Sequence, residues 1–289
     1  KPVEHVQAEI KSVTGGASII FVAGEFYVYR PARPGVWGGV DRKVVEGWVT
    51  KIIGTESARL AGVRDVVELL QALAYRESDI LNGEDGFLNL RNGFLNLDTF
   101  TLEPHRKDVY STIQIDIEFD KKADCPRFQR FIDEVIVDEQ MQPDRPAQAV
   151  LQEFVGYVLT TDTRFEKTLL FEGPGANGKS VLLKILEMLV GPENVSSVPL
   201  ERLDDQFRLA ELHGKLLNLA AEVATRGSRT INADIFKQVV SGDLIQTAKK
   251  YRPPFDFHPV AKHVFAMNTL PRIYDTSLGF WRRILVIRF

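Results

Sequence analysis

One glycine-rich stretch carries residues of the types and spacing that hold a nucleotide phosphate. It fits the pattern G-x-x-x-x-G-K-[ST] at every fixed position and consists of Gly173, Pro174, Gly175, Ala176, Asn177, Gly178, Lys179 and Ser180. Glycines let backbone N–H groups curl around phosphate oxygens, and the start of a helix adds positive potential. The spacing predicts that Lys179 reaches the β- and γ-phosphates and that the Ser180 hydroxyl holds Mg²⁺.

The flanking sequence supplies the elements that such a loop needs. An apolar run at 167–171 reads as a strand, and residues 181–190 carry apolar side chains at helical spacing. A strand, a glycine-rich turn and a helix in this order favour a phosphate-binding loop over a glycine-rich turn in front of an ordinary helix. The loop alone predicts a site for a nucleoside triphosphate and leaves the reaction open.

Two polar residues follow later apolar runs and could complete a hydrolytic site. Glu222 is the first acid after the run 216–221, where it could orient water and support Mg²⁺ directly or through water. Because Ala221 precedes it, no acidic pair exists there. Asn268 follows the run 262–267, and its neutral amide could hydrogen-bond the γ-phosphate or the attacking water. The alternatives are an ordinary strand-end carboxylate and a turn-forming Asn before Pro271.

Basic residues near the end of the chain are candidates for contacts with a second molecule. Arg282 and Arg283 open the last apolar run, and either could reach the nucleotide of a neighbouring subunit, because arginine suits bidentate phosphate contact. A surface pair at a strand start is the alternative. Residues 244–257 read as a β-hairpin with a basic, proline-stiffened tip. The tip residues that we expect to contact DNA or RNA are Lys249, Lys250, Tyr251 and Arg252.

The charge of the chain is unevenly distributed. The 289 residues carry a net charge of −3, but residues 226–289 hold eleven Lys or Arg against four Asp, a net +7. A basic end on an acidic chain is a candidate surface for a polyanion. The single cysteine, Cys125, excludes an internal disulfide and suits the cytoplasm, and no apolar run approaches the roughly 20 residues that span a bilayer. The chain begins without Met, so we expect it to be part of a longer protein.

The order of the patterns predicts three regions. Residues 1–55 read as a small β-rich module, 56–163 as a mainly helical region, and 164–289 as a nucleotide-binding α/β domain. The last region alternates helices or loops with four apolar runs, at 167–171, 215–221, 262–267 and 284–289, which is typical of a largely parallel sheet. Four aromatic residues near the start fit a small core better than a base-stacking surface: Phe26, Tyr27, Tyr29 and Trp37.

These motifs, in this order, resemble the superfamily 3 helicases, within the D5-like primase–helicase family of phages and plasmids. Residues 85–131 resemble the D5 N-terminal region. The other matching segments are Gly173–Ser180 (motif A), 216–222 (motif B), 234–257 (the region with a DNA-tracking hairpin), 264–268 (motif C with a sensor Asn) and 281–283 (the arginine-finger segment). The resemblance covers most of the chain after residue 56.

The resemblance implies an AAA+-like P-loop ATPase domain with a mostly parallel central sheet, preceded by an α+β collar region. It implies a DNA helicase that uses ATP and Mg²⁺, assembles as a ring, usually a homo-hexamer, and translocates on single-stranded DNA. Such an enzyme would unwind forked duplex in the cytoplasm of a bacterial host cell, its collar linked to a primase and no membrane involved. Catalytic roles would fall on Lys179, Glu222, Asn268 and Arg282 or Arg283, with the arginine acting across a subunit interface.

Two other functions remain open. The chain could be an NTP-binding assembly module that organises a primase on DNA without unwinding it. It could also be an ATPase that remodels protein. Unwinding of forked DNA separates the helicase from the assembly module, and dependence on DNA and on Lys249 and Lys250 separates both from the remodelling ATPase.

Overall fold

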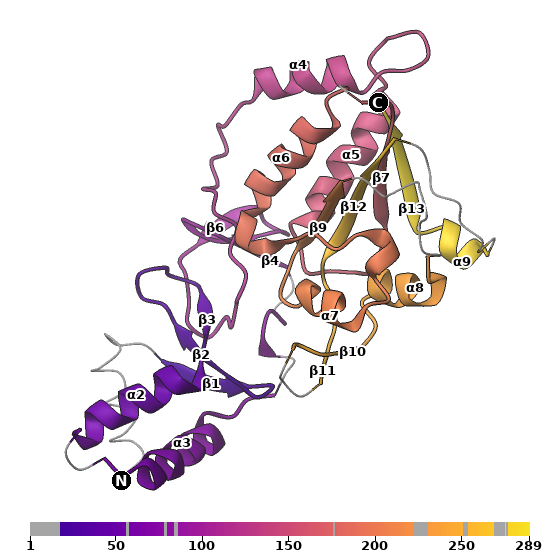
Figure 1. Ribbon diagram of the computed structural model, residues 1–289. Coiled ribbons are helices and arrows are strands. Elements are labelled where there is room, and N and C mark those ends of the chain that lie inside the picture. The colour runs from indigo at the N-terminus through magenta and orange to yellow at the C-terminus, as the bar shows by residue number, and fades with distance from the viewer. Residues whose placement is uncertain are drawn as a thin grey trace. The chain divides into compact units, whose positions relative to one another are not determined.

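The computed structural model describes residues 18–55, 58–77, 80–83, 86–175, 177–221, 231–250, 254–268, 275 and 277–289. The chain divides into two compact units, Lys1–Gln114 and Ile115–Phe289 (Figure 1). These limits differ from the expected region boundaries at residues 55 and 163.

The first unit is built on two antiparallel sheets. Its elements are β1 (Ile19–Val22), β2 (Glu25–Tyr29), β3 (Trp37–Val40), α2 (Arg42–Ile53), α3 (Leu60–Ala74), β4 (Phe87–Leu90), β5 (Gly93–Asn96) and β6 (Thr101–Glu103). One sheet has the order β1-β2-β3 and the other β4-β5-β6. The β1–β2 turn has positive φ at Ala23 (48°) and Gly24 (81°), as a two-residue type I′ hairpin requires. β1 and β2 therefore form a tight hairpin, in keeping with the β-rich character expected of this region.

Helices α2 and α3 pack on one face of the β1–β3 sheet. Phe26 of β2 lies in one buried cluster with Val45 and Val49 of α2 and with Val63 and Val67 of α3. Because α3 shares this core with the strands, the chain does not separate at residue 55. Each of the four aromatic residues singled out above is at most 8% exposed, which confirms their assignment to the core.

The second unit carries the phosphate-binding loop. Its elements are α4 (Pro126–Val135), α5 (Arg145–Val158), β7 (Thr168–Glu172), α6 (Lys179–Val190), β8 (Val195–Ser196), α7 (Gln206–Leu209), β9 (Leu217–Ala221), α8 (Ala233–Ser241), β10 (Ile245–Thr247), β11 (Phe255–Phe257), β12 (Lys262–Met267), α9 (Leu278–Trp281) and β13 (Ile284–Arg288). Short 3-10 turns lie at Pro192–Asn194, Leu200–Arg202 and Ala210–Leu212.

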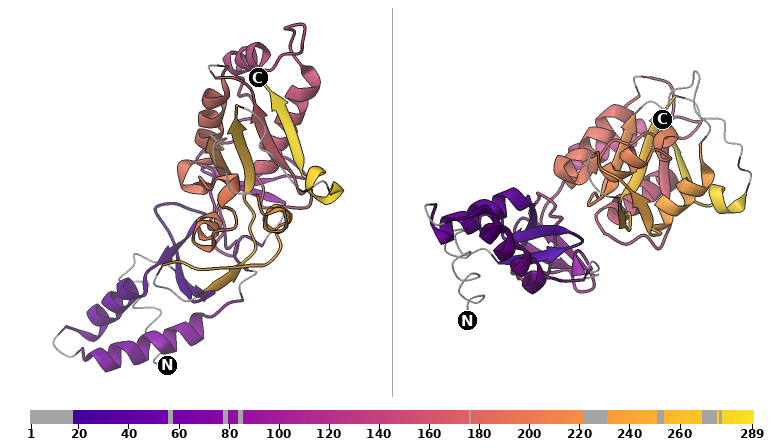
Figure 2. Two further views of the ribbon diagram at one scale, coloured as in Figure 1. Left: turned by 45° about the vertical axis from the view of Figure 1, so that its right-hand side comes forward. Right: turned by 60° about the horizontal axis from the view of Figure 1, so that its bottom comes forward.

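Five strands form a parallel sheet in the order β13-β7-β12-β9-β8 (Figure 2). The four apolar runs predicted as strands are β7, β9, β12 and β13, so the expected parallel α/β sheet is confirmed. β7 pairs with both β12 and β13, and β12 separates it from β9. Since the strands are parallel, their carboxyl ends meet at one edge of the sheet, where ligands bind in such folds.

One face of this sheet is covered by the elements that follow β8. Leu170 and Phe265 of the sheet share a buried cluster with Phe236 and Val239 of α8 and with Phe280 of α9. On the other side, α6 packs beside β9. α4 and α5 belong to this unit because Val135 of α4 lies against the phosphate-binding loop and Lys262 of β12 donates to the Thr160 carbonyl just after α5. Both helices before β7 are therefore packed against the loop or the sheet of this unit.

A separate two-stranded hairpin follows α8. β10 and β11 pair antiparallel, with Ile245 opposite Phe257 and Thr247 opposite Phe255. This confirms the hairpin predicted at 244–257. Among the helices that the structure describes, none combines the length and the apolar character that crossing a bilayer requires.

Candidate nucleotide site and nucleic-acid interface

The loop between β7 and α6 has a backbone that only glycine fits at two positions. Gly173 has φ of 155°, and a Cβ atom there would lie 2.5 Å from the Phe289 carbonyl oxygen and 2.6 Å from Asn177 Nδ2. Gly178 has φ of 95° and immediately precedes α6, and a Cβ atom there would lie 2.7 Å from Val135 Cγ1. The loop is thus a tight cradle that ends at the amino terminus of α6, which suits an anion.

Lys179 lies inside this cradle, where its partners among the described residues are neutral. Its Nζ donates to the Gly173 carbonyl at 2.6 Å, to the Pro174 carbonyl at 3.0 Å and to Asn177 Oδ1 at 3.0 Å. The residue is 8% exposed, and burial lowers its pKa. These three partners are uncharged oxygens. An anionic phosphate that replaced them would therefore bind the positively charged Lys179 more strongly than they do.

The rest of the loop residues fit the same reading. Ser180 is exposed at the start of α6, and Pro174 and Gly175 are exposed as well. The Asn177 amide donates to the Phe289 carbonyl at 3.3 Å, which ties the loop to the end of β13. Ala176 lies outside the described residues. The donor set, a lysine, a serine hydroxyl and backbone N–H groups, fits a nucleotide phosphate and its Mg²⁺.

Asn268 lies at the same sheet edge as the loop. It follows β12, whose last residue, Met267, is opposite Glu172 at the end of β7. The Gly173 N–H also donates to the Met267 carbonyl at 3.3 Å. Register therefore places Asn268 level with the first glycine of the loop, and it is exposed. Glu222, which follows the last residue of β9, lies outside the described residues, so its role stays a prediction.

The two arginines lie at the other edge of the sheet. β13 begins just after Arg283, and Ile284 is opposite Thr168, the first residue of β7. The five residues of β7 span roughly 16 Å between that position and the phosphate-binding loop. Arg282 has a side chain that is 52% exposed, whereas that of Arg283 is 9% exposed. The chain therefore does not bring either arginine to its own loop.

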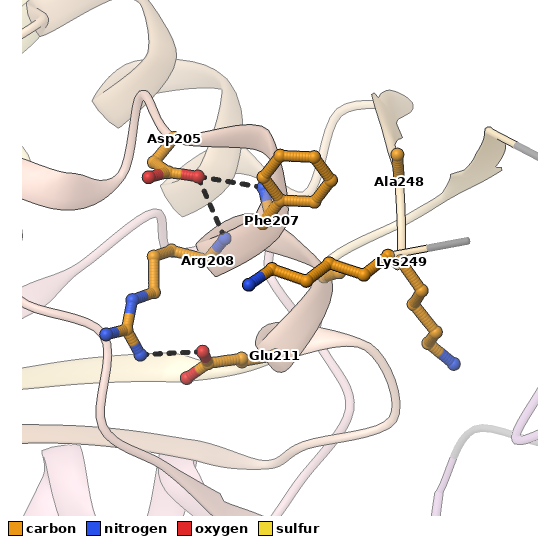
Figure 3. Close-up of a pocket in the computed structure, with 8 residues that line it drawn as sticks. Asp205, Phe207, Arg208, Glu211, Ala248 and Lys249 are labelled. Carbon is orange, nitrogen blue, oxygen red and sulfur yellow. Dashed lines mark hydrogen bonds and ion pairs between the residues drawn. The ribbon is translucent and has the colours of Figure 1, made fainter. Parts of the chain in front are cut away.

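The segment that begins the tip of the β10–β11 hairpin borders an open hollow of about 610 Å³ (Figure 3). Its lining residues come from the hairpin and from the α7 segment: Asp205, Phe207, Arg208, Ala210, Glu211, Ala248, Lys249 and Lys250. Lys249 Nζ lies 5.2 Å from the centre of the Phe255 ring. Arg208 pairs with Glu211 at 2.8 Å, and Asp205 caps α7 by accepting from the Phe207 N–H at 2.9 Å. Of the four predicted tip residues, Tyr251 and Arg252 lie outside the described residues.

The sequence patterns missed Phe207, which is 44% exposed beside Lys249 and Lys250. A helix of four residues is too short to show a periodic pattern. The signal available in the sequence was an aromatic residue within a polar stretch. They also missed Asn218, which is fully buried in β9. Its amide binds the Val198 N–H at 2.7 Å and the Val198 carbonyl at 2.8 Å. Asn218 is a positioning residue that fixes the segment after β8 against the central strands.

Two family models match the chain. The model described as "D5 N terminal like" matches residues 37–137, and a family of unknown function, DUF5906, matches residues 171–283. The protein named "Putative helicase L207/L206" of Acanthamoeba polyphaga mimivirus is 28% identical over 156 residues, which are 52% of this chain and 16% of that protein.

Solved structures show the same fold over nearly the whole chain. Two apo structures of the NrS-1 C-terminal region match with TM-scores of 0.63 and 0.64 at 14% identity. Each match covers 98% of this chain and 61% of the other. The chain thus spans a small part of the mimivirus protein and less than two thirds of the NrS-1 structures.

The fold and the loop define the second unit as a P-loop-type α/β domain that follows an α+β region. Within that class, the D5 N-terminal match and the mimivirus relative support a narrower assignment. The chain resembles the D5-like primase–helicases of superfamily 3, as its motifs predicted.

Proposed function

We propose that this chain is the ATP-driven motor region of a D5-like DNA helicase. The observation that carries the proposal is the position of Lys179, buried in a glycine cradle at the carboxyl edge of a parallel sheet and bound, among the described residues, to the uncharged oxygens of Gly173, Pro174 and Asn177. The helicase name of the mimivirus relative supports the choice of reaction class. The link to a primase, the homo-hexameric ring and the bacterial cytoplasm belong to the same proposal and follow from the family resemblance.

We assign the residues at the carboxyl edge of the sheet separate roles in the binding and hydrolysis of ATP. Lys179 exchanges the carbonyls of Gly173 and Pro174 for phosphate oxygens, and the N–H groups of the loop bind the β-phosphate. Ser180, with Glu222 directly or through water, would hold Mg²⁺, which would supply charge neutralisation at the phosphates. Glu222 orients the attacking water, and Asn268, level with Gly173, hydrogen-bonds the γ-phosphate.

A complete site takes its arginine from a neighbouring copy. Arg282 and Arg283 lie roughly 16 Å along β7 from the loop of their own chain. Arg282 is the residue that can serve another chain, because its side chain is half exposed. Arg283 is buried, and its guanidinium binds Ser241 Oγ at 2.7 Å and the Gly279 carbonyl, which suits support of the local structure. Head-to-tail contacts of this kind form a ring when the rotation between copies closes.

The hollow beside the hairpin is the proposed contact with single-stranded DNA. Lys249 and Lys250 suit the phosphate backbone, and the exposed ring of Phe207 suits stacking on a base. Tyr251 and Arg252 follow these lysines in sequence and stay predicted DNA contacts. DNA held here in several copies of a ring would move with the hairpins as ATP is turned over.

Mixing of two inactive variants tests the proposal. Lys179→Ala removes the loop's cation, Arg282→Ala removes the donated arginine, and each alone should abolish DNA-stimulated ATP hydrolysis. Mixed in equal amounts they should recover roughly a quarter of wild-type turnover, the share of interfaces that pair an intact loop with an intact arginine. Arg145→Ala is the matched control, because Arg145 is also an exposed arginine paired with a carboxylate, Asp133 at 2.7 Å.

The outcomes separate the competing functions. Wild-type turnover in Lys179→Ala would remove the nucleotide assignment. No recovery in mixed rings of confirmed size would reject the shared site. The same preparations are then given forked DNA: hydrolysis stimulated by DNA without strand separation would favour an assembly module that organises a primase. Hydrolysis indifferent to DNA would favour a remodelling ATPase.

A further inference from the structure

Glu166, two residues before β7, binds both arginines at the amino edge of the sheet. Its Oε2 atom forms an ion pair with Arg282 Nη2 and a second, at 3.0 Å, with Arg283 Nη2. No local pattern predicts this contact, because Glu166 and Arg282 are 116 residues apart. Glu166 thus binds Arg282, the arginine that we propose to complete the site of a neighbouring copy. This ion pair must break before Arg282 can reach that site.

The backbone aims the Glu166 carboxylate at this position. Glu166 has φ of 50°, in the left-handed region that non-glycine residues seldom adopt. Its N–H donates to the Thr163 carbonyl at 2.9 Å, and the Thr168 N–H donates to the Arg283 carbonyl at 2.7 Å. The turn and the start of β7 therefore hold Glu166 against the start of β13. Such a conformation is retained where the surroundings fix it, often at functional positions.

The two arginines differ in how firmly they are held. Arg283 is buried and has further partners in Ser241 and Gly279, so its departure would break these two hydrogen bonds as well. The guanidinium of Arg282 is half exposed and can turn toward solvent. When Arg282 leaves, Arg283 still pairs with the same Glu166 oxygen. Release of the outer arginine thus leaves no unpaired buried charge, which is the costly outcome for such groups.

We propose that Glu166 is a latch that holds Arg282 in a parked position until the nucleotide of a neighbouring copy draws it away. The proposal rests on the proposed function, in which Arg282 completes the neighbour's site. Glu166 is a positioning residue, since it acts on the reaction only through Arg282. The latch lies at the start of β7, and the phosphate-binding loop lies at the end of the same strand.

The expected size of the effect follows from exposure. Exposed ion pairs contribute little, so removing the latch charge should raise the rate at the neighbouring site about 1.5- to 5-fold. Glu166→Gln keeps an acceptor for Arg283 and removes the charge that holds Arg282. Because Glu166 lies at the edge opposite its own loop, the change should appear in kcat while the KM for ATP stays unchanged.

The test uses mixed rings in which one variant donates only the arginine. Subunits with Lys179→Ala donate Arg282 to subunits with Arg282→Ala, and the donor carries Glu166→Gln in addition. We expect recovered hydrolysis to rise about 1.5- to 5-fold over that of the unmodified donor. Asp133→Asn in the donor is the matched control, since it removes another exposed carboxylate–arginine pair in the same unit and should change nothing. Glu166→Asp, which shortens the side chain, gives a second variant if Glu166→Gln does not fold, and its donor should also exceed the unmodified one.

Several outcomes would overturn the latch. One is an unchanged or reduced rate with a correctly folded Glu166→Gln donor. Another is a rise of the same size with the Asp133→Asn donor, because the effect would then not be specific to the ion pair of Glu166 with Arg282. These differ from failure of the proposed function, in which the unmodified donor recovers no activity at all.

Discussion

Gly178 offers a direct test of the contact between α4 and the phosphate-binding loop. In Gly178→Ala the new Cβ would lie 2.7 Å from Val135 Cγ1 and 3.2 Å from Val135 Cβ, at a φ of 95°. Overpacking costs about 1–3 kcal/mol, and the left-handed conformation costs a further 1–2 kcal/mol, roughly. The free energy of unfolding should therefore fall by about 2–5 kcal/mol in urea titrations. ATP affinity should fall as well, since the same residue shapes the cradle.

A double-mutant cycle separates the two costs. Val135→Ala removes the methyl group that the new Cβ meets, so the double variant should lose about 1–3 kcal/mol less than the sum of the single variants. The cost of the left-handed conformation stays. Gly175→Ala is the matched control within the loop, because a Cβ atom there meets nothing within 4 Å. If the two single losses simply add, α4 does not press on the loop and the reasoning fails.

Two further predictions concern lysines of the second unit. Replacing both Lys249 and Lys250 by Ala should reduce the slope of log K against log [salt] for binding of single-stranded DNA by about 1.4. The same replacement of the exposed pair Lys121 and Lys122 should leave this slope unchanged. An unaltered slope in the first variant would mean that the DNA binds elsewhere. Burial lowers the pKa of Lys262 from 10.5 to about 7, so between these values the unfolded chain binds more protons and stability should rise with pH. Urea titrations should show a rise of roughly 2–3 kcal/mol from pH 7 to 9 that is lost in Lys262→Met, and an equal rise in that variant would contradict the assignment.

The elements that the sequence could predict are those specified by local patterns. The β7–loop–α6 unit follows from apolar periodicity and glycine spacing, and the β10–β11 hairpin follows from alternation around prolines. The parallel sheet was predictable because four apolar runs alternate with other elements. Each of these signals lies within a short stretch of chain.

Contacts between distant residues were beyond that reach. Nothing local indicates that α3 packs on β2 through Val63, or that Val135 of α4 fills the space beside Gly178. The sequence also left Arg282 and Arg283 equivalent, because their difference depends on Ser241 and Glu166. One arginine is buried and its neighbour is exposed because of how the surrounding elements pack. The identity of the two residues, which is the same, does not reveal this difference.

Under the proposed function, the parallel topology explains why one copy would not hold a complete site. Parallel strands place every carboxyl end at one edge, so the loop after β7 and Asn268 after β12 meet there. Arg282 precedes β13, a neighbour of β7 in the same sheet, and so it must lie at the opposite edge. No rearrangement of side chains can cross the length of β7, since an extended arginine reaches less than half of roughly 16 Å. Under the proposed function, Arg282 would therefore meet the γ-phosphate of a second copy, and repetition of that contact in one direction would build a ring where the rotation between copies closes.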